Sequence, residues 1–156
     1  MKINILIISL IITLTGLANS SYAQRCQEFH KSKYCQVEDS QGFKLSSLSR
    51  SNSLTIGQTI KYEVVLYGGK ELIIKCCTQD AYYPIRFKLK SSINGDVIYD
   101  NKYDKYINSI SLSLDRTELI SIEVTLVSTP ENKSVYVGKK ACVGLAIYTE
   151  VAKIRK

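Results

Sequence analysis

Residues 118–127 have the sequence Glu-Leu-Ile-Ser-Ile-Glu-Val-Thr-Leu-Val, and this stretch indicates the fold class of the chain. From Ile120 to Leu126 every second side chain is apolar, and polar side chains occupy the positions between them. A period of two is typical of a β-strand with one buried face, whereas a helix repeats about every 3.6 residues. The stretch therefore predicts a half-buried strand.

The same alternation extends through most of the chain on both sides of this strand. It is cleanest at residues 84–90, where apolar and basic side chains alternate, and Asn94-Gly95 is the strongest hairpin signal. Other strands are expected at residues 43–48, 59–67, 71–78, 96–100, 107–114 and 141–151, and a short one is also compatible with 134–137. About seven or eight short strands at this spacing predict an all-β, antiparallel β-sandwich.

Length and composition support one folded domain. The chain has 156 residues, of which 45% are hydrophobic, and its 8 Gly and 2 Pro are too few for a low-complexity or disordered chain. No convincing helix competes with the strands, although residues 25–38 could form an irregular turn or a short helix. We expect a cysteine-containing segment at residues 24–41 and a single sandwich domain at residues 42–156.

The first 23 residues have the features of a secretory signal peptide. Lys2 precedes an apolar run at residues 3–17, and residues 21–23 form a small-x-small cleavage site. A retained membrane anchor is the alternative, but the run has about 15 residues and a spanning helix needs about 20. We therefore expect cleavage after Ala23 and export to the periplasm, the cell surface or the medium.

Export predicts that most of the cysteines are paired, because thiols outside the cytoplasm meet an oxidising environment. Alternation places Cys76 on the apolar face of its strand, and it places Cys77 and Cys142 on the faces that point away from the core. If the two strands are neighbours, the expected bridges are Cys77 with Cys142 and Cys26 with Cys35, which leaves Cys76 as a buried thiol. A vicinal Cys76–Cys77 bridge is a strained alternative.

Metal and catalytic motifs are sparse. Cys26, His30 and Cys35 include the only histidine, but their spacing matches no common zinc site. A calcium site is conceivable at four oxygen-bearing residues, although lysines flank them: Asp96, Asp100, Asn101 and Asp104. No Gly-x-Ser-x-Gly, phosphate-binding glycine loop or His-Glu-x-x-His motif occurs. We therefore expect no enzymatic activity, no metal and no cofactor.

Tyrosines are the most informative candidates for binding. The chain has 11 Tyr but 3 Phe and no Trp, and several tyrosines fall in predicted loops among charged residues. Such rings stack on sugar faces or anchor protein interfaces; alternatively, they pack the sandwich and its loops. The candidate ligand-binding residues are Tyr82, Tyr83, Tyr99, Tyr103 and Tyr106.

The formal charge of +7 has two interpretations. The lysines and arginine that gather toward the C-terminus could contact an anionic envelope surface, a polysaccharide or lipid headgroups without spanning the membrane. They could equally keep exposed strands soluble. Export disfavours nucleic acid as a partner.

Several segments resemble small exported bacterial β-sandwich proteins, whose shape is similar to jelly-roll modules of the pre-peptidase C-terminal and GOLD types. The segments are residues 43–49, residues 53–58, the run Tyr-Glu-Val-Val-Leu-Tyr-Gly-Gly from Tyr62, Phe87-Lys-Leu, Val97-Ile-Tyr-Asp and Cys142-Val-Gly. The resemblance covers nearly all of the chain after the leader. It implies a jelly-roll-like fold, a non-enzymatic exported module, and cysteines that recur together at positions 77 and 142, although the additional Cys76 departs from that pattern.

Together these observations predict an exported, non-catalytic β-sandwich that binds a protein or a glycan of the bacterial cell envelope. The alternative is a carbohydrate-binding accessory domain or a small hydrolytic enzyme of another type.

Overall fold

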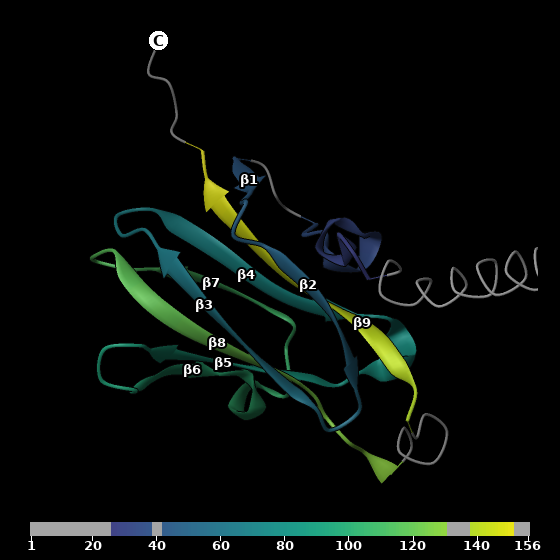
Figure 1. The fold of residues 1–156 in the computed structure, drawn as a ribbon. Helices are drawn as coiled ribbons and strands as arrows, with labels where there is room; N and C mark the ends of the chain where they lie inside the picture. The colour runs from purple at the N-terminus through teal and green to yellow at the C-terminus, as the bar shows by residue number, and fades with distance from the viewer. Residues whose placement is uncertain (1–25, 39–41, 131–137, 152–156) are drawn as a thin grey trace, which may run out of the picture.

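The computed structural model describes residues 26–38, 42–130 and 138–151. Over these residues it contains nine β-strands in two antiparallel sheets that pack face to face (Figure 1). The predicted all-β sandwich is therefore confirmed. The expected leader at residues 1–23 and the short strand at residues 134–137 lie outside the described residues. Within the described ranges, no helix is long and apolar enough to cross a membrane.

The first sheet has five strands, with β9 at its centre. Their order is β1-β9-β4-β7, and β2 pairs with β9 beside β1. The bounds are β1 Phe43–Leu45, β2 Arg50–Thr55, β4 Glu71–Thr78, β7 Ser109–Ser113 and β9 Lys140–Glu150. The strand β2 was not predicted, because its sequence Arg-Ser-Asn-Ser-Leu-Thr has one large apolar residue and no alternation.

The second sheet has four strands in the order β3-β8-β5-β6. The bounds are β3 Thr59–Leu66, β8 Glu118–Leu126, β5 Ile85–Ser91 and β6 Val97–Asp100. Each of these strands was expected from its alternation. Short 3-10 turns complete the described structure at Phe29–Lys31 (η2), Lys33–Cys35 (η3), Asp80–Tyr82 (η4) and Asn101–Asp104 (η5).

The strands pair in a nested order. β2 pairs with β9, β3 with β8, β4 with β7 and β5 with β6, while β4–β9 and β5–β8 pairs complete the two sheets. This nesting of eight strands across two sheets is the jelly-roll arrangement. It brings together strands from distant parts of the chain, so that the face of each sheet combines side chains that are far apart in sequence.

The main core lies between the two sheets. Strands β3, β5, β8 and β9 contribute every second side chain, and Phe87, Ile122 and Ile147 are among those with no exposed surface. Cys76 also lies in this core, as its position in the alternation predicted.

The outer face of the first sheet is also buried, because the segment of η2 and η3 lies across it (Figure 1). Phe29, Tyr34 and Val37 of this segment pack against a second small cluster that contains Ala146 and Tyr148 of β9. The Tyr148 hydroxyl donates a 3.1 Å hydrogen bond to the Cys35 carbonyl. Alternation predicted only that this face points away from the main core, because alternation does not show what covers a face.

The two disulfides fasten this N-terminal segment to the sheet. They join Cys26 to Cys142 and Cys35 to Cys77, with Cα–Cα distances of 5.0 and 5.2 Å, and Cys76 is a buried free thiol. The four bridged cysteines are the expected candidates, but the expected pairing is wrong.

The register of β4 against β9 explains the observed pairing. Cys77 lies directly opposite Gly144, so Cys142 is its diagonal neighbour. Diagonal neighbours lie about 7–8 Å apart, and a disulfide bridges Cα atoms up to about 6.8 Å apart. Each of these two strand cysteines therefore pairs with a cysteine of the covering segment.

Candidate ligand-binding face

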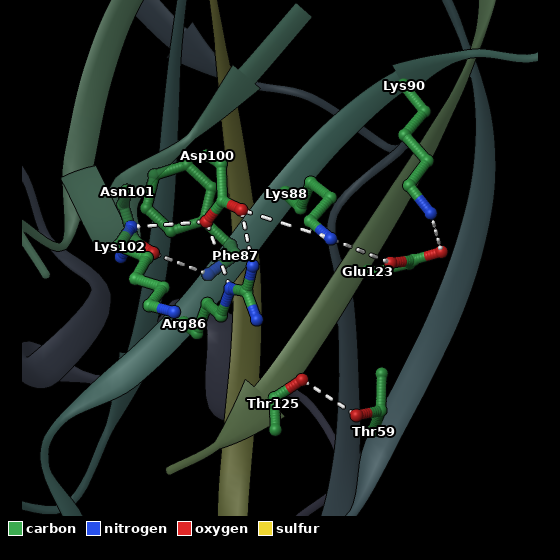
Figure 2. Close-up of polar contacts among 10 residues, drawn as sticks. All are labelled: Thr59, Arg86, Phe87, Lys88, Lys90, Asp100, Asn101, Lys102, Glu123 and Thr125. Atoms are coloured by element: carbon green, nitrogen blue, oxygen red, sulfur yellow. Dashed lines mark hydrogen bonds and ion pairs between the residues drawn. The ribbon is translucent and has the colours of Figure 1, made fainter. Parts of the chain in front are cut away.

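The outer face of the second sheet carries three basic side chains on β5. Alternation along this strand turns Phe87 into the core and leaves Arg86, Lys88 and Lys90 half-buried on the outer face. Acidic residues of the neighbouring strands lie opposite these cations (Figure 2). We call this surface the polar face; it consists of Thr59, Arg86, Lys88, Lys90, Asp100, Glu123 and Thr125.

Asp100 is tightly held on this face. Arg86 donates hydrogen bonds from Nε and Nη2 to the two carboxylate oxygens, at 3.0 and 2.5 Å, and the Lys102 backbone N–H donates another at 3.1 Å. The side chain of Asp100 is only 4% exposed. The hydrogen bond from Arg86 lowers the pKa of Asp100, with the Lys102 backbone hydrogen bond and the charges of Arg86 and Lys88 acting in the same direction. Asp100 is therefore a structural anion that joins β6 to β5.

Glu123 and Lys90 form the second ion pair of the polar face. Lys90 Nζ donates to Glu123 Oε1 at 2.6 Å. Lys88 lies between the two paired carboxylates, with Nζ 3.9 Å from Asp100 Oδ2 and 4.0 Å from Glu123 Oε2. Charge-assisted hydrogen bonds are typically about 2.7–2.9 Å long. Lys88 is therefore attracted to both carboxylates and hydrogen-bonded to neither.

A small cleft opens beside Lys88. It has a volume of about 110 Å³ and is lined by Thr59, Arg86, Lys88, Glu123 and Thr125. The hydroxyls of Thr59 and Thr125 are 2.7 Å apart, so one donates a hydrogen bond to the other. The cleft thus combines cationic donors, one carboxylate and a hydroxyl pair, and such a set suits a polar ligand group.

Asn101 positions the loop at one edge of the polar face, and sequence reasoning missed this role. Its side chain has no exposed surface. Its Oδ1 accepts from the Phe87 backbone N–H at 2.9 Å, and its Nδ2 donates to the carbonyls of Ile85 and Ile107. One amide therefore satisfies three backbone groups. The signal in the sequence was only an Asp-Asn pair, which is equally typical of a solvated turn.

The structure separates the five candidate tyrosines into two groups. Tyr82, Tyr83 and Tyr99 pack against the main core, and the Tyr99 ring lies 5.5 Å from the Phe87 ring. Burial raises the pKa of Tyr99. These three follow the packing interpretation of the sequence.

Tyr103 and Tyr106 lie in the loop that Asn101 holds. Tyr103 is 83% exposed, and Tyr106 is half-buried in a left-handed backbone conformation, with φ of 59°. Both lie in the loop that begins at Asn101, directly after Asp100, which Arg86 holds. The fold therefore places two of the five candidate tyrosines in the loop that leaves the polar face at Asp100.

His30 and Ser51 form a histidine–serine pair, which is a combination that hydrolytic enzymes use. His30 Nδ1 is 2.8 Å from Ser51 Oγ, but this oxygen also accepts the His30 backbone N–H at 2.9 Å. The hydroxyl thereby fastens the N-terminal segment to β2. Among the described residues, His30 has no carboxylate hydrogen bond that would orient it as in a catalytic triad.

The residues that were weighed as metal ligands, and not chosen, are used in other ways. Cys26 and Cys35 form disulfides with different strands, so they do not meet at His30 as a ligand set. Asp100 is bound by Arg86, and Asn101 is bound to three backbone groups. In the part of the chain that the structure describes, no group of three His, Cys, Asp or Glu side chains is placed to hold a metal ion.

A second hollow, of about 790 Å³, lies where the N-terminal segment meets β4 and β7. Lys33, Gln36 and Lys75 are among its lining residues. The ammonium of Lys75 donates a 2.6 Å hydrogen bond to the Gln36 carbonyl, so this cation holds the covering segment in place. Lys75 thus has a hydrogen-bond acceptor, whereas Lys88 is hydrogen-bonded to neither of its neighbouring carboxylates.

Comparisons with known proteins gave one type of match. No protein-family model matches the chain, and no curated protein matches it. Among solved structures, the chain is similar to PliG from Aeromonas hydrophila, a periplasmic lysozyme inhibitor of g-type lysozyme. The identity is 17%, the alignment covers 73% of this chain and 93% of PliG, and the TM-score is 0.47. The resemblance to pre-peptidase C-terminal and GOLD modules is not shown by these comparisons and stays a prediction.

Proposed function

We propose that the protein is an exported, non-catalytic binding module of the bacterial cell envelope and that it binds its ligand through the polar face. The observation that carries this proposal is the position of Lys88: a half-buried ammonium that lines a cleft and lies at the outer limit of ion-pair distance from both neighbouring carboxylates. Ligand sites are concave surfaces with a few convergent polar groups, and the cleft has these properties.

The disulfides support export. Bridges that form and persist are typical of proteins in oxidising compartments, and this chain has two, both of which fasten the N-terminal segment. They agree with the signal peptide that the sequence predicts at residues 1–23.

A binding role is also favoured over catalysis by how the titratable groups are used. Asp100 and Glu123 are paired with cations, and Ser51 is engaged by the backbone of His30. A general acid or base has to exchange protons near neutral pH, whereas the Arg86 pair lowers the pKa of Asp100 and keeps it ionised.

A sedimentation assay tests the proposed function. The chain from Gln24 would be labelled and incubated with washed cell envelopes, and the bound fraction would be measured against protein concentration. We expect saturable binding that weakens in Lys88→Gln. Lys44→Gln is the matched control, because Lys44 is exposed on β1 of the other sheet and the substitution removes the same charge. Absence of saturable binding, or equal binding by Lys88→Gln and the wild type, would overturn the proposal.

A further inference from the structure

Lys88 has unused hydrogen-bonding capacity. An ammonium has three donors, and among the described residues no acceptor lies within hydrogen-bond distance of Lys88 Nζ, the nearest carboxylate oxygens being 3.9 and 4.0 Å away. Its side chain is only 23% exposed, so solvent reaches it incompletely. Arg86 and Lys90, by contrast, each donate to a carboxylate at 2.5–2.6 Å. A ligand that supplies an acceptor here would satisfy a partly desolvated cation.

The charge of the polar face favours an anionic acceptor. Three cations, Arg86, Lys88 and Lys90, face two carboxylates, Asp100 and Glu123, so one positive charge is left without a counterpart. A cleft lined by cations raises the local concentration of anionic ligands. The formal charge of the whole chain is +7, so the rest of the molecule also attracts anionic ligands.

The size of the cleft limits what enters it. Pockets for whole drug-sized ligands measure about 300–1,000 Å³. The cleft beside Lys88 measures about 110 Å³, so it accommodates one functional group of a larger ligand. The paired hydroxyls of Thr59 and Thr125 retain one donor proton and several lone pairs, which suits a hydroxyl beside the anionic group.

The neighbouring tyrosines favour a sugar as the bearer of that group. Tyr103 is 83% exposed and lies in η5, which begins directly after Asp100, the partner of Arg86 on the polar face. An exposed tyrosine ring offers a large amphipathic surface at low cost in conformational entropy. An acidic sugar joins a flat apolar face, hydroxyls and a carboxylate in one unit, and so matches the ring, the threonine hydroxyls and the cations together.

We propose that the cleft binds the carboxylate of an acidic polysaccharide between Lys88 and Arg86, with the threonine hydroxyls on a sugar hydroxyl and Tyr103 against the sugar ring. This inference rests on the proposed function, because it names the ligand class for the same face.

Binding of defined oligosaccharides by isothermal titration calorimetry tests the ligand class. The probes are hexagalacturonate, its fully methyl-esterified form, which lacks the charge, and hexaglutamate, which keeps the charge without the sugar. We expect the wild type to bind hexagalacturonate about tenfold or more tightly than either other probe, since a charge-assisted hydrogen bond is lost in one and the ring contact in the other. Added salt should weaken the binding.

Variants assign the site. We expect Lys88→Gln to weaken binding of hexagalacturonate about tenfold or more, and Thr125→Val and Tyr103→Ala to weaken it by smaller factors. Lys44→Gln should bind as the wild type does. The melting temperature of each variant checks that it folds, and Tyr103→Ala changes an exposed side chain, so that it remains informative if Lys88→Gln is destabilised.

The outcomes separate the ligand class from the proposed function. Equal affinity for the methyl ester, equal affinity of Lys88→Gln, or tighter binding of hexaglutamate would overturn the acidic glycan, and the last result would favour an acidic protein. Envelope binding that excess hexagalacturonate does not displace would overturn the glycan while the proposed function stands. Absence of any envelope binding would overturn both.

Discussion

Gly144 lies directly under the Cys35–Cys77 bridge, opposite Cys77 in the pairing of β4 with β9. A Cβ at this position would be 2.6 Å from Cys35 Sγ and 2.7 Å from Cys77 Sγ, and 3.0 Å from the Cα of His30. The backbone at this position is ordinary extended strand and would accept any residue. The close approach of the bridge is therefore what requires a glycine. A single missing side chain therefore lets the N-terminal segment lie against the sheet.

We predict that Gly144→Ala lowers the free energy of unfolding by about 1–3 kcal/mol, because overpacking a tight contact displaces its neighbours. Urea denaturation measures the change. In a Cys35→Ala/Cys77→Ala background the sulfur atoms are absent, so the same substitution should cost less. An equal cost in both backgrounds would contradict the role of the bridge.

His30 is a second residue whose environment gives a testable effect. Burial lowers the pKa of His30, and the charges of Lys31 and Arg50 act in the same direction, while Glu28 opposes them. The unfolded chain therefore takes up a proton near pH 6.5, and the folded chain does so only at lower pH. The stability that His30 contributes is complete above about pH 6.5 and is lost as the pH falls below it.

We predict that the wild type loses more stability than His30→Gln between about pH 7.5 and about pH 5.5. Glutamine keeps an acceptor for the Ser51 hydroxyl and does not titrate in this range. Urea denaturation at the two pH values provides the comparison. Parallel losses in both proteins would show that protonation of His30 does not weaken the contact with β2.

At the scale of the elements, β5 and β6 show how a strand pair builds a binding face. The bulge between Leu89 and Lys90 shifts the register, so that Lys88 lies opposite Asp100 and Lys90 lies opposite Val97. The Arg86–Asp100 pair then fastens the end of β6, and the loop with Tyr103 begins at the next residue. Placement of this ring therefore depends on a buried carboxylate.

We predict that Asp100→Asn lowers the free energy of unfolding by about 1–3 kcal/mol, because Arg86 loses its charged acceptor. Arg86 lowers the pKa of Asp100, so the carboxylate stabilises the fold above its ordinary pKa and this contribution is lost as the pH falls through the lowered value. The variant should lack this part of the acid sensitivity. Denaturation curves at neutral and acidic pH measure both effects.

Asp96→Asn is the matched control, because Asp96 lies exposed in the β5–β6 turn and the substitution removes the same charge. We expect it to change the free energy of unfolding by less than about 0.5 kcal/mol. Equal destabilisation by both variants would contradict a specific role for the Arg86 pair.

At the scale of the whole molecule, the fold has three layers: the second sheet, the first sheet and the N-terminal segment. The segment is fastened by two disulfides, by the His30–Ser51 contact and by the hydrogen bond from Lys75 to Gln36. The Cys26–Cys142 bridge joins residues 116 positions apart and closes almost the whole described chain into a loop. Closing long loops restricts the unfolded chain most strongly.

We predict that thiol alkylation followed by intact mass measurement labels none of the cysteines in the native protein, one after denaturation and all five after reduction. Cys76 has no exposed surface, and burial raises the pKa of its thiol, so it does not react in the folded state. The same measurement shows whether the chain begins at Gln24, as cleavage of the predicted leader requires.

Peptide mapping without reduction then identifies the bridges. Peptides that join Cys26 to Cys142 and Cys35 to Cys77 are expected. A Cys77–Cys142 peptide would contradict the observed register.

The sequence by itself determined the strands and their inward faces. Alternation is a local property, and one-sided burial imposes it on β3, β5 and β8 wherever they lie in the fold. It therefore predicted the sandwich, the buried Cys76 and the outward basic residues of β5. It failed for β2, whose polar sequence carries no such pattern and whose place is set by pairing with β9.

Only the tertiary structure decided which residues meet. Alternation assigns Cys77 and Cys142 to outer faces. The register between the strands places Gly144, and not Cys142, opposite Cys77, so both cysteines form disulfides with the covering segment. In the same way, Lys88 and Glu123 come together because β5 pairs with β8, a strand about 30 residues away in the chain. Such contacts depend on register and on covering layers, which are properties of the whole fold and leave no periodic signal in the sequence.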